Sequence, residues 1–489
     1  MRDYSFGNFI SALRERAGLS QYQLGALVGV TDKAVSKWEN GASKPRIDTI
    51  RKLSEVLDVS VDELLTCEYA TFNKERKDLF AMKYKIIKIA KNKMKELYGE
   101  NPPIRIANRF KTEELMLDGQ EELLWMGFLG KLQEKCYEED AYFDVRGAKT
   151  GASFIAWLLG GTNVNPLSPH YYCPSCKSVE FVSNEKCGLD LPDKKCSCGS
   201  YYNKDGFGID AVNMYPIRNY NEIYVSSGAT VYVKKCLQEY FKDYGVIREV
   251  NVIYDDDMCV LDDKLLMTKF VLFSKDMVKK YPEEVITMKG EEYFKSLSDW
   301  SILTVVENVE ERISSRDLLD VKFTPEQIKA YFEYAVANNK FIGYDGDMNL
   351  EKVLADIKNP SFNDLISLYG FIHSTGAWKD NGEILYDKGI PLSQLISNRE
   401  DVYAYVYDKL NGKCCDNPSG QVFEIMEDVR KGKYSNNRMP ATIEQLLLEC
   451  EVPEWYVESM KKILYLFPKT HLVVLVKRDI CKFVKMNKG

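Results

Sequence analysis

The chain has 489 residues, too many for one hydrophobic core, so we expect roughly two to four domains. Hydrophobic residues make up 45% and charged residues 28%, as in a globular protein, and no apolar run reaches the roughly 20 residues that span a bilayer. The net charge is −7, so DNA contacts would require local basic surfaces. The amino terminus lacks a secretory signal, and we expect a cytoplasmic protein whose 13 cysteines stay reduced, with metal ligation favoured over disulfides.

The first 67 residues predict an all-α domain of five short helices. Apolar residues recur at helical spacing over residues 6–13, and Ser20 is a favourable N-cap for a second helix over residues 21–28. A three-residue turn leads into a helix over residues 32–40, so two helices meet across a tight corner, as in a helix-turn-helix. Two further helices are expected over residues 47–57 and 61–65. The predicted core consists of Leu24, Val35, Trp38, Ile50 and Leu53.

The segment SQYQLGALVGVTDKAVSKWENGASKP resembles the central part of Cro/C1-type (XRE family) repressor domains. In such domains the helix after the turn enters the major groove and reads base edges, while neighbouring residues hold phosphates. The resemblance implies a protein that binds a double-stranded DNA operator as a homodimer. The base-reading positions are Thr31, Asp32, Lys33, Ser36 and Lys37, and the phosphate-holding positions are Gln21 and Lys44.

A polar linker is expected over residues 68–84, and it leads into a strongly basic segment. Residues 74–95 contain nine Lys or Arg residues against Glu75 and Asp78. The apolar residues of this segment fall near one helical face, which predicts a solvated amphipathic helix. The alternative is a helix that follows the phosphates of DNA.

Several later segments resemble the PolC-type bacterial replicative polymerase, the C-family DNA polymerase III alpha subunit, in the family's order. The segments DVRGAKTGASFIAWLLGGTNVNPLSPHYYCPSCKSVEF and DLPDKKCSCGSYYNKDG resemble its palm and zinc module. The segments SFNDLISLYGFIHSTGAW, VFEIMEDVRKGK and VPEWYVESMKKILYLFPKTHLVV resemble its fingers. The resemblance implies a truncated, multidomain chain: an α+β palm over residues 85–355 with a zinc module at 170–202, then mostly helical fingers over residues 356–489.

Two cysteine pairs, Cys173-x-x-Cys176 and Cys196-x-Cys198, have the paired spacing of a tetrahedral zinc site. Four thiolates leave no open coordination position, so we expect a structural zinc ion and not a catalytic one. The PolC-type pattern has two residues between the second pair, whereas one intervenes here. Cys187 lies nearby and is an alternative ligand.

The resemblance also points to the expected catalytic strand. In the family, two Asp separated by one residue follow the zinc module and hold the two metal ions of nucleotidyl transfer. In the matching segment NEIYVSSG, Glu222 keeps one carboxylate and Tyr224 stands in the place of the second. A phenol with a pKa of about 10 cannot bridge two magnesium ions. The third Asp is best matched by Glu307, so the resemblance implies a degenerate catalytic site, with magnesium required only if it is active.

An acidic run offers an alternative source of carboxylates for metal ions. It consists of Asp255, Asp256 and Asp257, with Asp262 and Asp263 close behind. Such a run is typical of a solvated loop.

The phosphate-contacting positions of the family are better matched than the catalytic ones. Residues Arg146, Gly147, Lys149, Gly151 and Ser153 resemble the glycine-serine loop at the triphosphate, where small residues let backbone N–H groups approach oxygen. The matching fingers positions are His373, Arg399, Arg430, Lys431, Lys433, Lys469 and His471. The alternative is that these residues persist only as parts of the fold and surface, because salt-bridged Arg and Lys are common structural elements.

Together these observations predict a nucleoid-associated DNA-binding regulator with an inactive PolC-like core. The core would sense or mimic a replication component, such as a nucleotide, DNA, a replisome subunit or a polymerase inhibitor. One alternative is a decoy that interferes with the host replicative polymerase, as a mobile element or a defence system would use. The other is an active DNA-directed DNA polymerase.

Overall fold

The computed structural model describes residues 4–487, except for 18, 58, 60, 62–63, 65–73, 118–121, 216–219, 227, 243–245, 254–266, 274–281, 290–302, 310–311, 343, 345–349 and 413–417. The chain divides into two compact units, Met1–Ala81 and Met82–Gly489. In the part of the chain that is described, no helix combines the length and the apolar character needed to cross a lipid bilayer.

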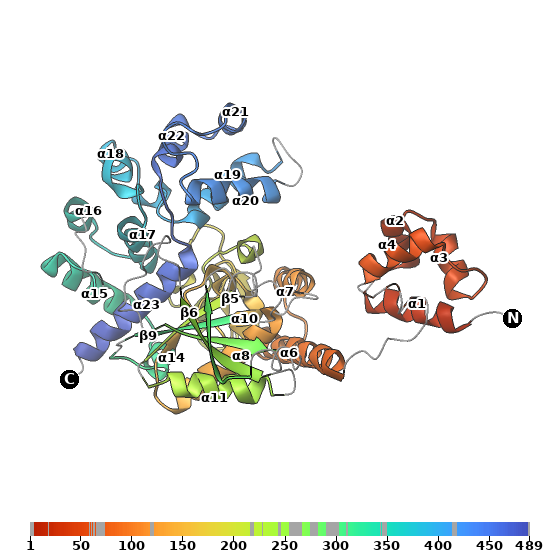
Figure 1. Cartoon of the computed structure of the whole chain (residues 1–489). Helices are drawn as coiled ribbons and strands as arrows, with labels where there is room; N and C mark the ends of the chain where they lie inside the picture. Colours follow the sequence, from red (N-terminus) through yellow and green to blue (C-terminus); the bar gives the residue numbers. More distant parts are fainter. Residues whose placement is uncertain are drawn as a thin grey trace. The chain divides into compact units, whose positions relative to one another are not determined.

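The first unit is a helical domain, shown in red in Figure 1. Its helices are α1 (Tyr4–Arg16), α2 (Gln21–Val28), α3 (Asp32–Glu39) and α4 (Ile47–Leu57). The five core residues expected from the sequence are all buried in one cluster, so the predicted core is confirmed. Trp38 is 5% exposed, in agreement with an inward-facing anchor. The fifth helix expected over residues 61–65 falls partly outside the described residues.

Local signals explain the tight corner between α2 and α3. The Ser20 side chain caps α2 in a capping box with Gln23. Gly29 ends the helix with a φ of 79°, a left-handed conformation that costs glycine little. A Cβ on Gly25 would lie 2.8 Å from the carbonyl oxygen of Val30, so only glycine lets the turn pack this closely.

Helix α6 (Lys74–Tyr98) is the amphipathic helix expected from the basic segment. Its buried residues in the second unit recur every four positions, namely Ile86, Ala90, Met94 and Tyr98. The helix begins at Lys74. The linker predicted over residues 68–84 is therefore wrong for residues 74–84, which are helical. The segment is helical because Lys, Arg and Glu, although polar, are good helix formers.

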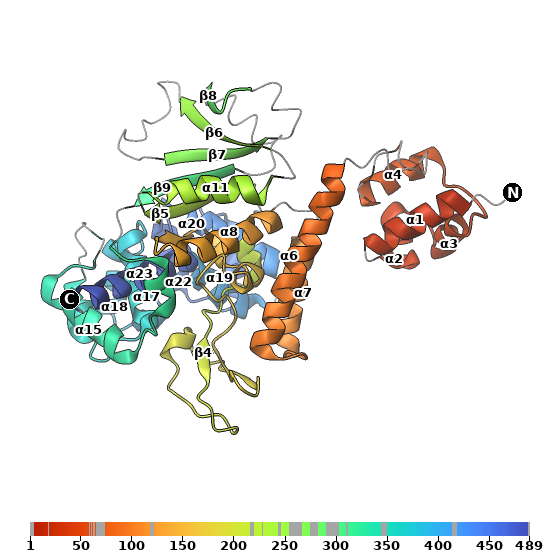
Figure 2. The same cartoon turned by 90° about the horizontal axis from the view of Figure 1, so that it is seen from below.

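The second unit contains two sheets and many helices, as an α+β fold predicts (Figure 2). Its palm-side helices are α7 (Ile104–Met116), α8 (Glu122–Glu138), α9 (Ala148–Gly151), α10 (Phe154–Leu158), η1 (Gly188–Asp190), η2 (Ala211–Met214), α11 (Thr230–Tyr240) and α14 (Ser315–Asp320). Helix α11 packs against α8 and contacts the larger sheet.

The larger sheet has six strands in the order β1-β5-β9-β7-β6-β8. The strands are β1 (Phe143–Asp144), β5 (Tyr220–Ser226), β6 (Val246–Ile253), β7 (Met267–Phe273), β8 (Val285–Lys289) and β9 (Leu303–Val309). Asp144 on β1 pairs with Tyr224 on antiparallel β5, and Tyr224 pairs with Glu307 on parallel β9. Three positions on adjacent strands therefore form one row across the sheet.

The smaller sheet is antiparallel and carries the cysteine module. Its strands are β2 (His170–Tyr172), β3 (Val179–Phe181) and β4 (Asn203–Asp205), in the order β3-β2-β4.

The remaining helices form the mostly helical part expected for the fingers. They are α15 (Pro325–Asn338), α16 (Glu351–Asp356), α17 (Phe362–His373), η3 (Trp378–Gly382), α18 (Glu383–Asp387), η4 (Leu392–Gln394), α19 (Arg399–Leu410), α20 (Ser419–Arg430), α21 (Ala441–Glu449), α22 (Glu454–Lys462) and α23 (Lys469–Met486). Helix α23, in dark blue in Figure 1, contacts α15, α17 and the palm helix α9. It therefore ties the helical part to the segment that follows β1.

Candidate functional site

The recognition helix α3 presents its predicted base-reading residues on the face opposite the core. Asp32, Lys33 and Lys37 are exposed, whereas Val35 and Trp38 point inward. Thr31 is the N-cap of the helix, and its hydroxyl accepts a hydrogen bond from the Ala34 backbone at 3.3 Å. Ser36 is half-buried and accepts a hydrogen bond from Asn40. The described geometry fits a helix that inserts its first turns into a groove.

The two predicted phosphate-holding residues have partners within the domain. The Gln21 amide donates to Glu39 at 2.7 Å, and Arg14 donates to the same carboxylate at 3.0 Å. The hydrogen bond with Glu39 raises the pKa of Arg14. Lys44 lies with its ammonium 5.5 Å from the centroid of the Phe6 ring. Glu39 thus braces α1, α2 and α3, a role that the sequence did not indicate.

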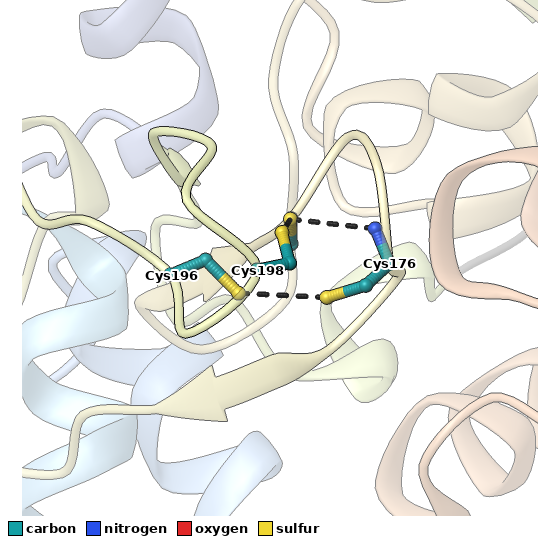
Figure 3. Close-up of side chains that lie close together, drawn as sticks. Cys176, Cys196 and Cys198 are labelled. Carbon is teal, nitrogen blue, oxygen red and sulfur yellow. Dashed lines mark hydrogen bonds between the residues drawn. The ribbon is translucent and has the colours of Figure 1, made fainter.

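The four predicted metal ligands converge in the smaller-sheet module (Figure 3). The sulfur atoms of Cys173, Cys176, Cys196 and Cys198 all lie within 4.8 Å of one another. The Cys173–Cys198 and Cys176–Cys196 sulfur pairs are each 3.4 Å apart. In a tetrahedral zinc site with Zn–S bonds of about 2.3 Å, the sulfur atoms are about 3.8 Å apart. The cluster therefore has the size and donor set of a metal site.

The alternative ligand Cys187 does not belong to this cluster, because the metal-sized group among the described residues contains only the other four cysteines. Cys187 is fully buried, and this burial raises the pKa of its thiol.

The expectation that all cysteines stay reduced also needs correction, because Cys450 is disulfide-bonded. The half-buried carboxylate of Asp190 accepts hydrogen bonds from the first backbone N–H groups of α17 at Phe362 and Asn363, which links the module to the helical part.

The position predicted for the second catalytic carboxylate is occupied by an aromatic stack. The guanidinium carbon of Arg146 lies 3.8 Å from the centroid of the Tyr224 ring. Arg146 also donates through Nε to both carboxylate oxygens of Asp144, at 3.1 and 3.2 Å. Asp144 is 3% exposed and accepts a further hydrogen bond from the Tyr142 hydroxyl. We refer to Asp144, Arg146 and Tyr224 as the Asp–Arg–Tyr cluster.

Electrostatics keep the Arg146 guanidinium charged. Burial lowers the pKa of Arg146, but Asp144 more than offsets this effect, and the pKa stays above its ordinary value. The Asp144 carboxylate, on the strand next to Tyr224, is thus already paired with a cation of the chain. The side chains of Glu222 and Glu307 lie outside the described residues, although Glu307 is the backbone partner of Tyr224. The acidic run at residues 255–257 and 262–263 also lies outside them.

Most basic residues predicted to contact phosphates pair with carboxylates of the same chain. In the helical part of the second unit, Glu427 accepts a hydrogen bond from Arg430 at 2.7 Å and pairs with Lys431 at 3.0 Å. Burial alone would raise the pKa of Glu427, but Arg430 and Lys431 lower it to about 2. The other pairs are Arg399 with Glu400 and Glu427, Lys433 with Asp428, and Lys149 with Glu122. This pairing favours the structural interpretation for these residues.

Other predicted phosphate contacts also serve the fold. The Ser153 hydroxyl caps α10 and donates to the buried carboxylate of Glu113 at 2.9 Å. The same Glu113 accepts from the next two backbone N–H groups, so this helix start is already satisfied. The Lys469 ammonium donates to the carbonyl oxygens of Lys186 and Phe207. Gly147 faces open space, whereas a Cβ on Gly151 would collide with Thr470 at 2.6 Å.

Two predicted histidines lie together beside the Asp–Arg–Tyr cluster. The rings of His373 and His471 are 6.4 Å apart. Burial, together with the positive charges of Arg146 and Arg478, lowers the pKa of His373 to about 4 and that of His471 to about 3. Both imidazoles are therefore neutral at pH 7.

Comparison with known proteins follows the division of the chain into two units. Residues 10–64 match a helix-turn-helix family. Most of the chain is similar to "DNA polymerase III PolC-type" proteins: the one from Ureaplasma parvum is 28% identical over 78% of this chain, and those from Clostridium perfringens and Staphylococcus aureus are each 26% identical over 79% and 78%. The chain is a helix-turn-helix domain fused to a PolC-like region. It spans about 30% of the length of each of these relatives.

Sequence reasoning did not find three residues that organise the PolC-like region. Asp144 pairs with Arg146. Glu427 forms ion pairs with three basic residues, namely Arg399, Arg430 and Lys431. Arg478 lowers the pKa of His373 and His471. Because Glu427 pairs with Arg399 and Arg478 acts on His373, both connect segments far apart in the sequence. The charged run Lys477-Arg478-Asp479, which interrupts apolar residues in α23 and is buried, was a signal that could have been noticed.

Proposed function

We propose that this protein is a sequence-specific DNA-binding regulator whose PolC-like region does not catalyse nucleotidyl transfer. The helix-turn-helix domain reads an operator, as a dimer on two half-sites about one DNA turn apart. The PolC-like region senses or mimics a component of replication. The observation that carries this proposal is the stack of Arg146 on Tyr224.

Two-metal nucleotidyl transfer requires carboxylates that converge on two cations about 4 Å apart. The described side chains at this place do not fit a magnesium pair. Tyr224 offers a phenol, and the carboxylate of Asp144 is occupied by Arg146. A divalent cation here would meet a fixed positive charge at close range, which is unfavourable in a buried setting.

Within the PolC-like region, Cys173, Cys176, Cys196 and Cys198 would hold a zinc ion. Zinc bound by four thiolates supplies structural cross-linking and no open position for a substrate. Asp190 connects the metal module to the helical part, because its carboxylate accepts hydrogen bonds from the first backbone N–H groups of α17. We infer that the metal maintains the shape of the surface that a ligand or partner recognises.

The signal that this region detects is a nucleotide, primer-template DNA, a replisome subunit or a polymerase-directed inhibitor. Similarity to PolC-type proteins over most of the chain supports this range of ligands. The second candidate function is a decoy that competes with the host polymerase, with the helix-turn-helix domain controlling its own expression. The same similarity favours it, because a shared surface can occupy the polymerase's partners.

Two assays with the full chain test the proposal. Primer extension with dNTPs and magnesium or manganese should give no product. Any extension that survives repurification would overturn the hypothesis that the PolC-like region is catalytically inactive. Selection from random duplexes should yield a short palindromic operator, and failure to enrich any sequence would contradict the regulator. A regulator's operator affinity changes with its ligand, because coupling between sites is reciprocal. A decoy instead slows extension by an active PolC-type polymerase.

A further inference from the structure

The basic helix α6 carries three exposed lysines without a counter-charge. Lys85, Lys88 and Lys91 are exposed, and none of them has an ion-pair or hydrogen-bond partner in the part of the chain that the structure describes. They recur every three residues, which places their Cβ atoms about 5–6 Å apart in one row on the solvent side of the helix. We refer to these three residues as the lysine row.

Exposed lysines on other helices of the second unit do have a counter-charge. Each pairs with a glutamate three or four residues later on the same helix, where the two side chains are neighbours. The examples are Lys111 with Glu114 on α7, Lys131 with Glu134 on α8, and Lys329 with Glu333 on α15.

No such glutamate is available to the lysine row. Lys88 and Ile89 lie three and four residues after Lys85. Lys91 and Asn92 lie three and four residues after Lys88. Like charges at this spacing destabilise a helix, and an anionic partner along the row would remove the repulsion. The row therefore fits a partner with several negative charges in series.

The same chain carries a domain that brings such a partner close. Residues 10–64 match a helix-turn-helix family, and α6 begins at Lys74. The ten residue steps from Leu64 to Lys74 can span at most about 35 Å, roughly the length of one turn of duplex DNA. A duplex bound by the helix-turn-helix domain is therefore present at a high effective concentration near the lysine row.

We propose that Lys85, Lys88 and Lys91 bind backbone phosphates of the duplex that the helix-turn-helix domain recognises. The inference rests on the DNA-binding part of the proposed function and deepens it, because it adds a second contact in the other unit of the chain. Ammonium groups donate to phosphate oxygens without reading bases, so the row contributes affinity and not specificity.

A lipid surface is a poorer fit to this helix. A helix that lies on a membrane inserts a broad apolar face between the headgroups. On the described part of α6, the large apolar side chains that are exposed are Tyr84 and Ile89. The other apolar residues of that part are wholly or partly buried in the second unit.

The test is equilibrium binding of the full chain to two duplexes of equal length, one with the selected operator and one with a scrambled sequence. The variant is Lys85→Gln/Lys88→Gln/Lys91→Gln, which keeps good helix formers. It should weaken binding to both duplexes by the same factor, at least about tenfold at ~0.1 M salt. The slope of log affinity against log salt should fall by about 2–3, because each phosphate contact contributes about 0.9.

The matched control removes the same charge from the paired lysines of the other helices, as Lys111→Gln/Lys131→Gln/Lys329→Gln. Its affinity should stay within about twofold of that of the unsubstituted chain, because charges more than about 10 Å from the DNA are largely screened. An equal loss in this control would overturn the inference, since net charge and not the lysine row would then set the affinity.

The remaining outcomes separate the inference from the proposed function. Unchanged affinity and salt slope in the lysine-row variant overturn the inference and leave an operator-binding regulator intact. Unchanged DNA binding, combined with lysine-dependent binding to vesicles of phosphatidylserine and phosphatidylcholine, assigns the row to a lipid surface and also overturns it. Failure to select an operator contradicts the proposed function instead, and the scrambled duplex still tests the row.

Discussion

The Arg146 guanidinium stacks on Tyr224 at 3.8 Å, at the strand position where similarity to PolC-type proteins predicts a metal-binding carboxylate. Asp144, the backbone partner of Tyr224, binds the same guanidinium. A cation–π contact that is shielded from water contributes more than an exposed one. The Asp–Arg–Tyr cluster is therefore both a structural element and the reason for the expected lack of catalysis.

Truncation of Tyr224 should expose this structural role. Tyr224→Ala removes the stacked ring and leaves Arg146 less well packed, so we expect a loss of ~1–3 kcal/mol in the free energy of unfolding, measured by urea denaturation. Tyr201, which is 61% exposed beside Lys195, is the matched control, and Tyr201→Ala should change stability by less than ~0.5 kcal/mol. Equal effects of the two substitutions would argue against a buried cation–π contact.

The ligand set of the metal module can be tested by metal content. Cys176→Ser should reduce bound zinc from about one ion per chain to near zero and lower the melting temperature, because three sulfur ligands bind more weakly than four. Cys187→Ala is the control and should keep its zinc, since Cys187 lies outside the cluster. Elemental analysis of the two purified variants provides the measurement. Loss of zinc from Cys187→Ala alone would reassign the site.

Base reading and phosphate holding should separate in the helix-turn-helix domain. Ser36→Ala on α3 should relax discrimination at one operator position by ~1–3 kcal/mol. Lys44→Ala should weaken all sequences alike and lower the slope of log affinity against log salt by about one. Binding titrations at several salt concentrations, on the selected operator and on scrambled DNA, measure both effects. A sequence-dependent effect of Lys44→Ala would exchange the assigned roles.

The half-buried histidines His373 and His471 make stability depend on pH. Their pKa values in the folded protein, about 4 for His373 and about 3 for His471, lie below the ordinary 6.5. The unfolded chain therefore takes up protons first, and stability should fall as the pH drops from about 6.5 to about 4. The variant His373→Gln/His471→Gln should flatten this part of a stability profile from denaturant unfolding. Glu427, whose pKa is lowered to about 2, contributes only to losses below about pH 4.5.

Local signals allowed much of the fold to be predicted, while long-range contacts were missed. Ser20, Gly29 and apolar spacing define the helix-turn-helix within a short segment, and the cysteine spacing anticipates the metal cluster. The role of Arg146 depends on the pairing of β1 with β5, which are about 80 residues apart, and no local pattern encodes it. The sequence therefore assigned Arg146 to a phosphate loop and could not reveal that it stacks on Tyr224.

Manganese anomalous scattering provides the most direct test of the central claim. Crystals of the full chain soaked with dATP and manganese should show no paired ions within coordinating distance of Asp144 and the Tyr224 position, with Arg146 still stacked on the ring. Two manganese peaks about 4 Å apart at this place, held by other carboxylates, would contradict the account and indicate a working polymerase centre.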